Sequence, residues 1–449
     1  MAARIIEIPE LLAHICAFLP DPESQSPTDD LKAFALASPY FRYHAQERLF
    51  RTLDLRRPTR EQSLAIISAL ATVVRTSPHL RSLIRVLRAS VDTQALRHLV
   101  DMQLTRLKEV GLELDTFASA GTKPLVRARG LGCHSDAELT LLEEHSGFNL
   151  EELSAEQGVV RDDTLFAAAG QLLATPSIHT VSLKGCFHHS SALNLVFGSC
   201  STSPNIHTIS LHPLVPSDTA NLYTRLSPPT NDADAEHVTR PLKFVRNLIL
   251  DGSSPVLESW MCSNECVFDI GGLYSLQLDS VEWALNAHGK GVGQRFLDRV
   301  GAQLHTLYIT HELILPSPTS LSSFTTLQRI QIVTPTIPFL ILMQLPDRLD
   351  LLEVLELGFH SLNRSAASER WEVREEHWGM LDRVLAGKRL PTLQAFTLLV
   401  DLTHGMDSEV SRSPPQQDWR RFEDKMLARI PGLLPEMYSR GVVSLRMLV

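Results

Sequence analysis

A short apolar spacing that recurs along the chain is the feature that most restricts its fold. The segments "TPSIHTVSLKGC", ending at Cys186, and "SPNIHTISLHPL", ending at Leu214, nearly repeat each other 28 residues apart. Both carry apolar residues at the first, fourth and sixth positions of a six-residue template. Further copies of this template begin at Leu107, Val245, Leu273, Leu304, Leu327, Leu352 and Leu393. The repetition predicts a fold in which each unit buries its apolar side against its neighbours.

Each unit is predicted to contain one strand and one helix. The fourth and sixth template positions alternate with a polar residue, which is the period of a strand with one buried face. Uninterrupted units begin 28, 28, 31, 23 and 25 residues apart, which is too long for a hairpin and suits a strand with a returning helix. The segment "DDTLFAAAGQLLATP" predicts such a helix, and Pro176 ends it shortly before the next template.

The template resembles the leucine-rich repeat, L-x-x-L-x-L-x-x-N/C-x-L, and "IHTVSLKGC" matches that pattern through Cys186. Most other units lack the Asn or Cys, so the similarity is to irregular, cysteine-poor members of the family. This resemblance implies an α/β leucine-rich-repeat solenoid, with parallel strands on the concave face and helices on the convex face.

The repeat domain is expected to span residues 53–449, with loop insertions near 212–241, 361–370 and 405–418. These three stretches are rich in polar residues and lack apolar periodicity, which is typical of long surface loops. Because lengthening a surface loop costs little free energy, such insertions are compatible with the repeats.

Residues 1–52 predict a small all-α module in front of the repeats. In "IPELLAHICAFL" the apolar residues recur at helical spacing, and Pro9 lies near the helix start, where its missing N–H costs nothing. Together with Asp30, Leu31 and "ALASPYFRYHAQERLF", this segment resembles the F-box, which docks onto the adaptor subunit of cullin-RING ubiquitin ligases. Two features depart from that family: Pro9 directly precedes Glu10, and "PESQSPTDD" lengthens the link between the first two helices.

The F-box resemblance implies that an apolar helical surface binds the adaptor and, through it, a cullin. The residues implied in this contact are Ile8, Pro9, Leu11, Leu12, Ile15, Leu19, Leu31 and Leu36. An alternative is that residues 4–52 form a helical cap that shields the apolar core of the first repeat.

Composition restricts the partners and the compartment. The chain of 449 residues has a formal net charge of -9, and an acidic surface attracts neither nucleic acid nor an anionic membrane. Its six cysteines show no pairing framework, which is typical of a reducing compartment. Because the N-terminus also lacks the apolar run of a signal peptide, we expect a cytoplasmic or nuclear protein.

No residue pattern predicts a catalytic, cofactor or metal site. Cys262 and Cys266 have no second Cys or His pair at zinc-finger spacing, so a pair of structural thiols on a helix fits them better. The segment "CFHHSS" contains no carboxylate, and the glycines of "HGKGVGQRF" match neither phosphate-loop consensus. We therefore expect a protein that is not an enzyme and has no cofactor.

Histidine follows the first template position in three units, at His179, His207 and His305. The first two would lie about one strand spacing apart if their units stack, which raises the hypothesis of a metal pair. A common origin of the repeats explains the match without a metal.

The repeats offer a binding surface, because the residues between the buried template positions align on one face of the parallel sheet. This face begins acidic and ends more apolar, so we expect a basic portion of a target against the glutamates and an apolar anchor near Val354 and Leu399. The residues predicted to bind the target are Glu109, Glu113, Glu152, Glu156, Lys184, His212, Asp251, Asp279, Tyr308, Arg329, Glu356 and Leu399. The alternative is an ordinary solvated face.

Both resemblances together predict the substrate-recognition subunit of an SCF-type cullin-RING ubiquitin ligase. Its F-box would bind the adaptor, its repeats would bind a protein substrate, and the assembled ligase would transfer the ubiquitin. The alternative function is a leucine-rich-repeat scaffold that binds a protein without any ligase role.

Overall fold

The computed structural model describes only part of the chain. The described residues are 39–56, 59–114, 163–185, 187, 190–198, 205–213, 243–251, 255–264, 266–279, 292–310, 321–334, 346–360, 375–387, 390–401, 424 and 427–448. The predicted adaptor-binding residues, Glu152, Glu156 and nearly all of the three predicted insertions lie outside these ranges.

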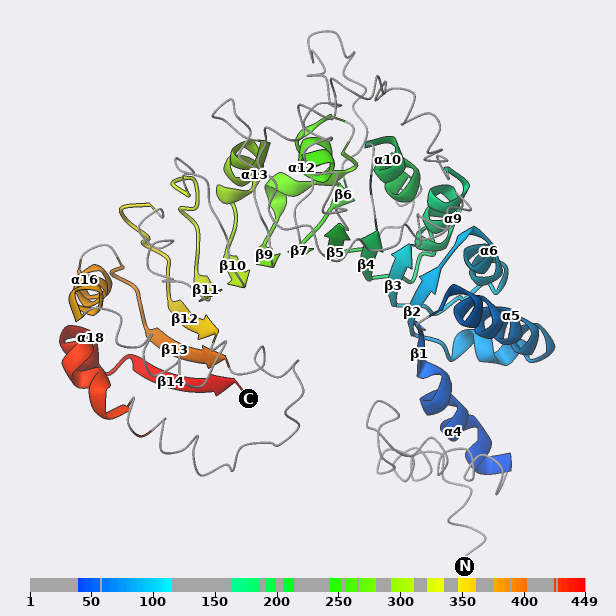
Figure 1. Ribbon diagram of the computed structural model, residues 1–449, viewed down its shortest axis with the longest axis horizontal. Coiled ribbons are helices and arrows are strands. Elements are labelled where there is room, and N and C mark those ends of the chain that lie inside the picture. Colours follow the sequence, from blue (N-terminus) through cyan, green and yellow to red (C-terminus); the bar gives the residue numbers. More distant parts are fainter. Residues whose placement is uncertain are drawn as a thin grey trace, which may run out of the picture. The chain divides into compact units, whose positions relative to one another are not determined.

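Twelve strands of the described residues form one parallel sheet in which neighbours follow chain order (Figure 1). They are β1 Thr52–Leu55, β2 Val86–Val91, β3 Glu109–Leu114, β4 Thr180–Gly185, β5 Thr208–Pro213, β7 Asn247–Asp251, β9 Ser275–Asp279, β10 Thr306–Thr310, β11 Arg329–Thr334, β12 Val354–His360, β13 Ala395–Asp401 and β14 Val443–Leu448. Two further short strands, β6 Lys243–Phe244 and β8 Phe268–Asp269, pair with each other. The expected parallel α/β sheet is confirmed, and it is compatible with a solenoid-like fold.

Helices alternate with these strands along the chain. They are α4 Pro39–Arg51, α5 Arg60–Thr76, α6 Thr93–Asp101, α9 Asp163–Leu173, α10 Ser190–Gly198, α12 Pro255–Cys262, α13 Val292–Gly301, α16 Glu375–Ala386 and α18 Pro435–Ser439, with the 3-10 helices η1 Pro78–Ser82 and η5 Ile270–Gly272. Helix α9 lies where the sequence predicts one. Among the described helices, none combines the length and the apolar character needed to cross a bilayer.

Two compact units make up the chain, Met1–Leu104 with Leu112–Leu172, and Thr105–Gly111 with Leu173–Val449. In the first unit α5 packs against α6 and β2. Side chains cap both helices, because Thr59 Oγ1 accepts a hydrogen bond from the Gln62 N–H at 3.3 Å, and Asp92 accepts one from the Ala95 N–H at 2.7 Å. The buried core residues of these elements include Ile67, Val74, Leu87, Ala89, Leu96 and Leu99.

In the second unit the helices lie on one face of the strands (Figure 1). The fourth and sixth template positions point toward them and are buried, as at Leu276 and Leu278. An aromatic cluster fills the space beneath α10 and α12, with the Phe197 and Phe268 ring centroids 4.9 Å apart and Trp260 stacked on Phe197 at 5.7 Å.

A repeated backbone contact joins successive strands at their starts. The carbonyl oxygen of the residue after the first template position accepts two N–H groups from the next unit. For example, the His179 carbonyl accepts the N–H groups of His207 at 3.0 Å and Thr208 at 3.2 Å, and the Tyr274 carbonyl accepts those of His305 and Thr306, both at 3.0 Å. This contact fixes the register of each strand against its neighbour.

Two predicted binding residues, Glu356 and Leu399, are buried. Leu399 was expected to anchor a target, but only 2% of it is exposed. It lies opposite Gly358, which lies opposite Val333, in the register of β11, β12 and β13. Because Gly358 has no side chain, Val333 and Leu399 close over it from both sides and are buried there. The sequence prediction for Leu399 is therefore wrong.

The closeness of this packing predicts that Gly358→Ala destabilises the protein. An added Cβ would lie 2.9 Å from both Leu399 Cβ and Val333 Cγ2, so we expect a loss of about 1–3 kcal/mol of unfolding free energy in urea titrations. Adding Val333→Ala should recover part of the loss. Gly198→Ala is the matched control, since nothing lies within 4 Å of a Cβ there; equal losses in both single variants would contradict this packing.

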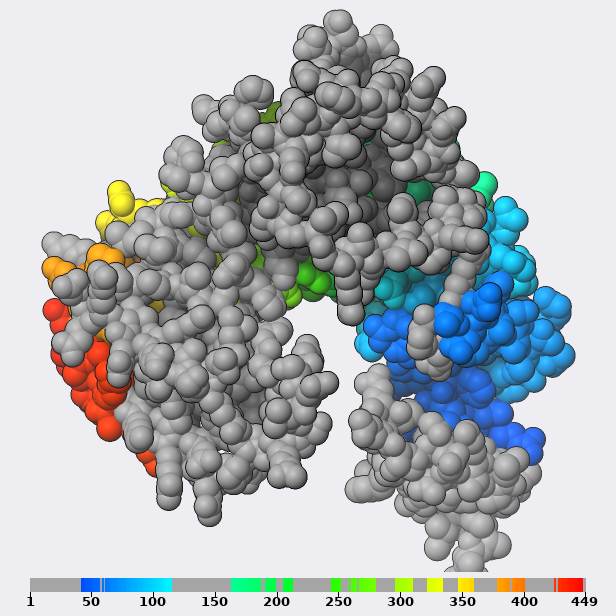
Figure 2. Space-filling model, viewed as in Figure 1, coloured from blue at the N-terminus to red at the C-terminus, as the bar shows by residue number. Residues whose placement is uncertain are grey.

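A buried carboxylate holds the short helix α18. Asp382 of α16 is 3% exposed, and its two oxygens accept the N–H groups of Glu436 and Met437, each at 3.0 Å. The residue before α18, Leu434, offers no side-chain cap. Figure 2 shows this segment, in red, on the surface of the molecule, so Asp382 supplies a cap from the side that faces the protein interior.

We expect Asp382→Ala to lower the unfolding free energy by about 1–3 kcal/mol, because two buried N–H groups lose their acceptor. Amide hydrogen exchange at Glu436 and Met437 should accelerate in that variant. Asp382→Asn keeps one acceptor oxygen and should lose less, whereas Asp347→Ala, at an exposed position, should change neither quantity. Unchanged exchange at the two amides would argue against this cap.

Candidate protein-binding face

Among the described residues the helices lie on one face of the sheet, and we call the opposite face the open face. It carries the third and fifth template positions of each strand and the residue after the sixth, such as Thr180, Ser182 and Lys184 on β4. Along the strands these residues alternate with the buried ones, as the sequence predicts. The face therefore consists of side chains that the apolar core does not use.

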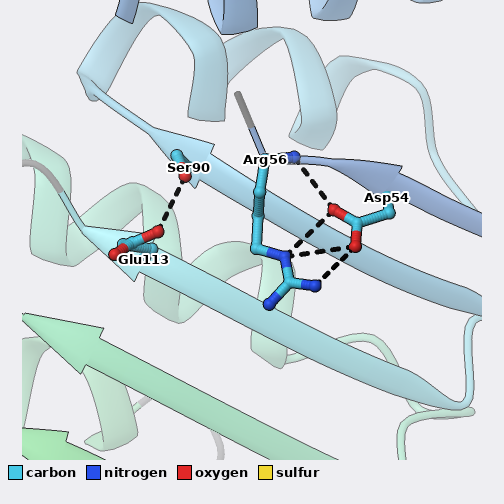
Figure 3. Close-up of polar contacts among 4 residues, drawn as sticks. All are labelled: Asp54, Arg56, Ser90 and Glu113. Carbon is cyan, nitrogen blue, oxygen red and sulfur yellow. Dashed lines mark hydrogen bonds and ion pairs between the residues drawn. The ribbon is translucent and has the colours of Figure 1, made fainter. Parts of the chain in front are cut away.

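In the first unit, acidic residues of the open face have partners (Figure 3). Arg56, just after β1, folds back onto Asp54, and its Nε lies 3.0 Å from Asp54 Oδ1. Hydrogen bonding from Arg56 lowers the pKa of Asp54, and the same bond raises the pKa of Arg56. Ser90 Oγ of β2 donates to Glu113 Oε2 of β3 at 2.9 Å. The face was predicted to begin with acidic residues, and the structure places the cation Arg56 and the hydroxyl donor Ser90 beside them.

Three polar residues form a hydrogen-bonded chain on β5 and β7 of the second unit. His212 Nδ1 lies 2.7 Å from Asp251 Oδ2, and His212 Nε2 lies 2.8 Å from Ser210 Oγ. Because a carboxylate only accepts, Nδ1 carries a proton, and in the neutral ring Nε2 then accepts the Ser210 proton. Lys184 on β4 is in register with His212.

This order of groups is that of a Ser-His-Asp proton relay. A nucleophilic serine also requires donors that stabilise the oxyanion of a tetrahedral intermediate. Around Ser210 the backbone lies in the strand pairs β4–β5 and β5–β7, so its N–H groups point along the sheet and not out of the open face. These hydrogen bonds are better suited to holding the His212 and Asp251 side chains in one fixed orientation for contact with a partner.

The remaining predicted residues lie on β9 to β12. Asp279 pairs in register with Asp251, and Tyr308 lies between Gln277 and Gln331. Arg329 Nη2 lies 3.1 Å from both oxygens of Glu356, and this hydrogen bonding raises the pKa of Arg329. The Glu356 side chain is only 10% exposed and the Arg329 side chain 42%. Arg329 is therefore the member of the pair that a partner can reach.

The two described cysteines lie in different surroundings. Cys262 ends α12, while Cys266 follows the helix and is 2% exposed. Burial raises the pKa of the Cys266 thiol to about 11, so it stays protonated at neutral pH and is a poor nucleophile. Of the two thiols expected on one helix, only Cys262 lies on α12.

Sequence reasoning missed the partners of several face residues. It placed His212 and Asp251 on the face but did not predict their contact with each other or that of His212 with Ser210, because a long insertion separates β5 from β7 and hides the register of the two strands. It also missed the pairing of Arg329 with Glu356. The neighbouring histidines gave a clearer signal: the His179 and His207 ring centroids lie 5.5 Å apart, as the repeat spacing suggests.

Among the described residues there is no group of three or more His, Cys, Asp and Glu side chains that could bind a metal ion. Comparison of the sequence with protein-family models gives no match, and neither does comparison with curated proteins.

The Arg329–Glu356 pair predicts an asymmetric response to substitution. Arg329→Met removes the Nη2 group that donates to both oxygens of the nearly buried Glu356 carboxylate. We therefore expect the unfolding free energy in urea titrations to fall by about 1–3 kcal/mol. The double variant Arg329→Met with Glu356→Met removes both charges and should lose less than the single variant. A double variant at least as unstable as Arg329→Met would contradict the pairing.

Proposed function

We propose that this protein is the substrate-recognition subunit of a cullin-RING ubiquitin ligase. In this proposal residues 1–52 are an F-box that binds the ligase adaptor, and the following strand–helix units are irregular leucine-rich repeats that bind a protein target. The assembled ligase transfers the ubiquitin, and this chain positions the target.

The observation that carries the binding role is the regular open face of the parallel sheet. Its strands stand in fixed register and present polar side chains whose orientation is set by neighbours, such as His212 between Ser210 and Asp251. Preorganised polar groups lower the entropy that a protein loses when a partner binds, which favours specific recognition. Lys184 and Arg329 add accessible cations to the acidic groups of the same unit.

The ligase role rests on a different feature, the similarity of residues 8–50 to the F-box pattern. Its adaptor-binding residues lie outside the described ranges, so the argument is one of sequence alone. If residues 4–52 are instead a helical cap, the open face keeps its binding role and the protein is a scaffold.

Recovery of the adaptor separates these two functions. We expect the full chain to co-purify with the adaptor subunit, and the double variant Leu12→Asp with Ile15→Asp to recover much less, because it places two charges on an apolar contact. The matched control is Val73→Asp, an apolar residue of α5 that is 44% exposed and should leave recovery unchanged. A wild-type chain that recovers no adaptor would support the scaffold.

A further inference from the structure

A second row of side chains lies at the starts of the strands, next to the open face. The repeated carbonyl contact places there the residues that follow the first template position. From β3 to β10 this strand-start row consists of Lys108, His179, His207, Arg246, Tyr274 and His305, all in the second unit. Each carbonyl accepts N–H groups from the next member, so the six residues form a continuous row.

Side chains of this row stack in two groups, His179 with His207, and Arg246 with Tyr274 and His305. The His179 and His207 rings lie 5.5 Å apart, the Arg246 guanidinium lies 4.8 Å from the Tyr274 ring centroid, and the Tyr274 and His305 centroids are 4.8 Å apart. Because Arg246 and His305 come from the strands on either side, both faces of Tyr274 are covered.

The row is exposed and cationic. Lys108, His207 and Arg246 are exposed, and Tyr274 is 37% exposed. Burial lowers the pKa of His207, and the neighbouring His179 and Arg246 lower it further, because a positive charge on His207 would be repelled by theirs. A bound anion would offset this repulsion. The whole chain has a net charge of -9, so the cations here are a local exception.

We infer that the strand-start row binds an Asp- and Glu-rich extended segment of a protein partner. Strands lie about 4.8 Å apart, so six row positions span roughly 24 Å, which an extended peptide covers with about seven residues. Carboxylates along such a segment accept hydrogen bonds from the guanidinium of Arg246, the ammonium of Lys108 and the ring N–H groups.

The stacking favours a peptide over a nucleic acid. Proteins bind single strands by stacking bases on open aromatic faces, and here Arg246 and His305 cover both faces of Tyr274, the one Phe, Tyr or Trp ring of the row. The net charge of the chain also opposes the approach of a long polyanion. That the segment belongs to a ligase target rests on the proposed function, whereas the binding itself does not.

Fluorescence anisotropy with the full chain and a labelled oligoglutamate of about ten residues tests this site. We expect saturable binding that weakens at least roughly tenfold when NaCl is raised from about 0.05 to 0.5 M. Arg246→Glu should weaken binding by roughly tenfold or more, because it reverses the central charge of the row. Lys108→Glu, at the end of the row, should weaken it less, and both variants should keep the wild-type melting temperature.

The matched control is Arg295→Glu on α13, an exposed arginine away from the row, which should change the affinity by less than about twofold. Equal loss in this control, or none in Arg246→Glu and Lys108→Glu, would overturn the site. Tighter binding of a single-stranded oligonucleotide of equal charge would overturn the peptide as its ligand. Adaptor recovery should be unaffected by Arg246→Glu, so failure of the peptide site is distinguishable from failure of the ligase role.

Discussion

The paired hydrogen bonds at the strand starts are the constraint on which the rest of this structure depends. One carbonyl, such as that of His207, accepts the N–H groups of both Arg246 and Asn247, each at 2.9 Å. A slip by one residue would exchange the buried and open faces of the strand, because side chains alternate with a period of two. The contact therefore decides which residues form the core, which form the open face and which form the strand-start row.

The two surfaces differ in how their charges are compensated. On the open face, charged groups have partners of opposite sign from within the same unit, as Asp54 has in Arg56 and Glu356 has in Arg329. In the strand-start row, by contrast, His207 lies beside Arg246 and another histidine. A partner of the open face must compete with existing contacts, so that face favours selectivity, whereas an acidic partner of the row would add a counter-charge beside Lys108 and Arg246.

The sequence template predicted β3 to β13 because their core positions are large and apolar, but it did not find the strands at either end. β2 has the small residue Ala89 at its sixth position, and β14 follows Arg440, a cation at its first position. Pairings on the face could not be predicted, since lateral neighbours such as His212 and Asp251 are 39 residues apart in the chain. Leu399 has the right period for the open face, and only the packing across Gly358 reveals that it is buried.

The strand-start contact uses backbone atoms alone, and this has a consequence for how such a protein can change. Lysine, histidine, arginine and tyrosine all occupy the row, while its hydrogen bonds stay within 2.8–3.2 Å from Lys108 to His305. Substitutions there need not disturb the register, so new specificities can arise position by position without a compensating change in the core. The row would suit a combinatorial library, in which only Pro, lacking the donor N–H, would have to be left out.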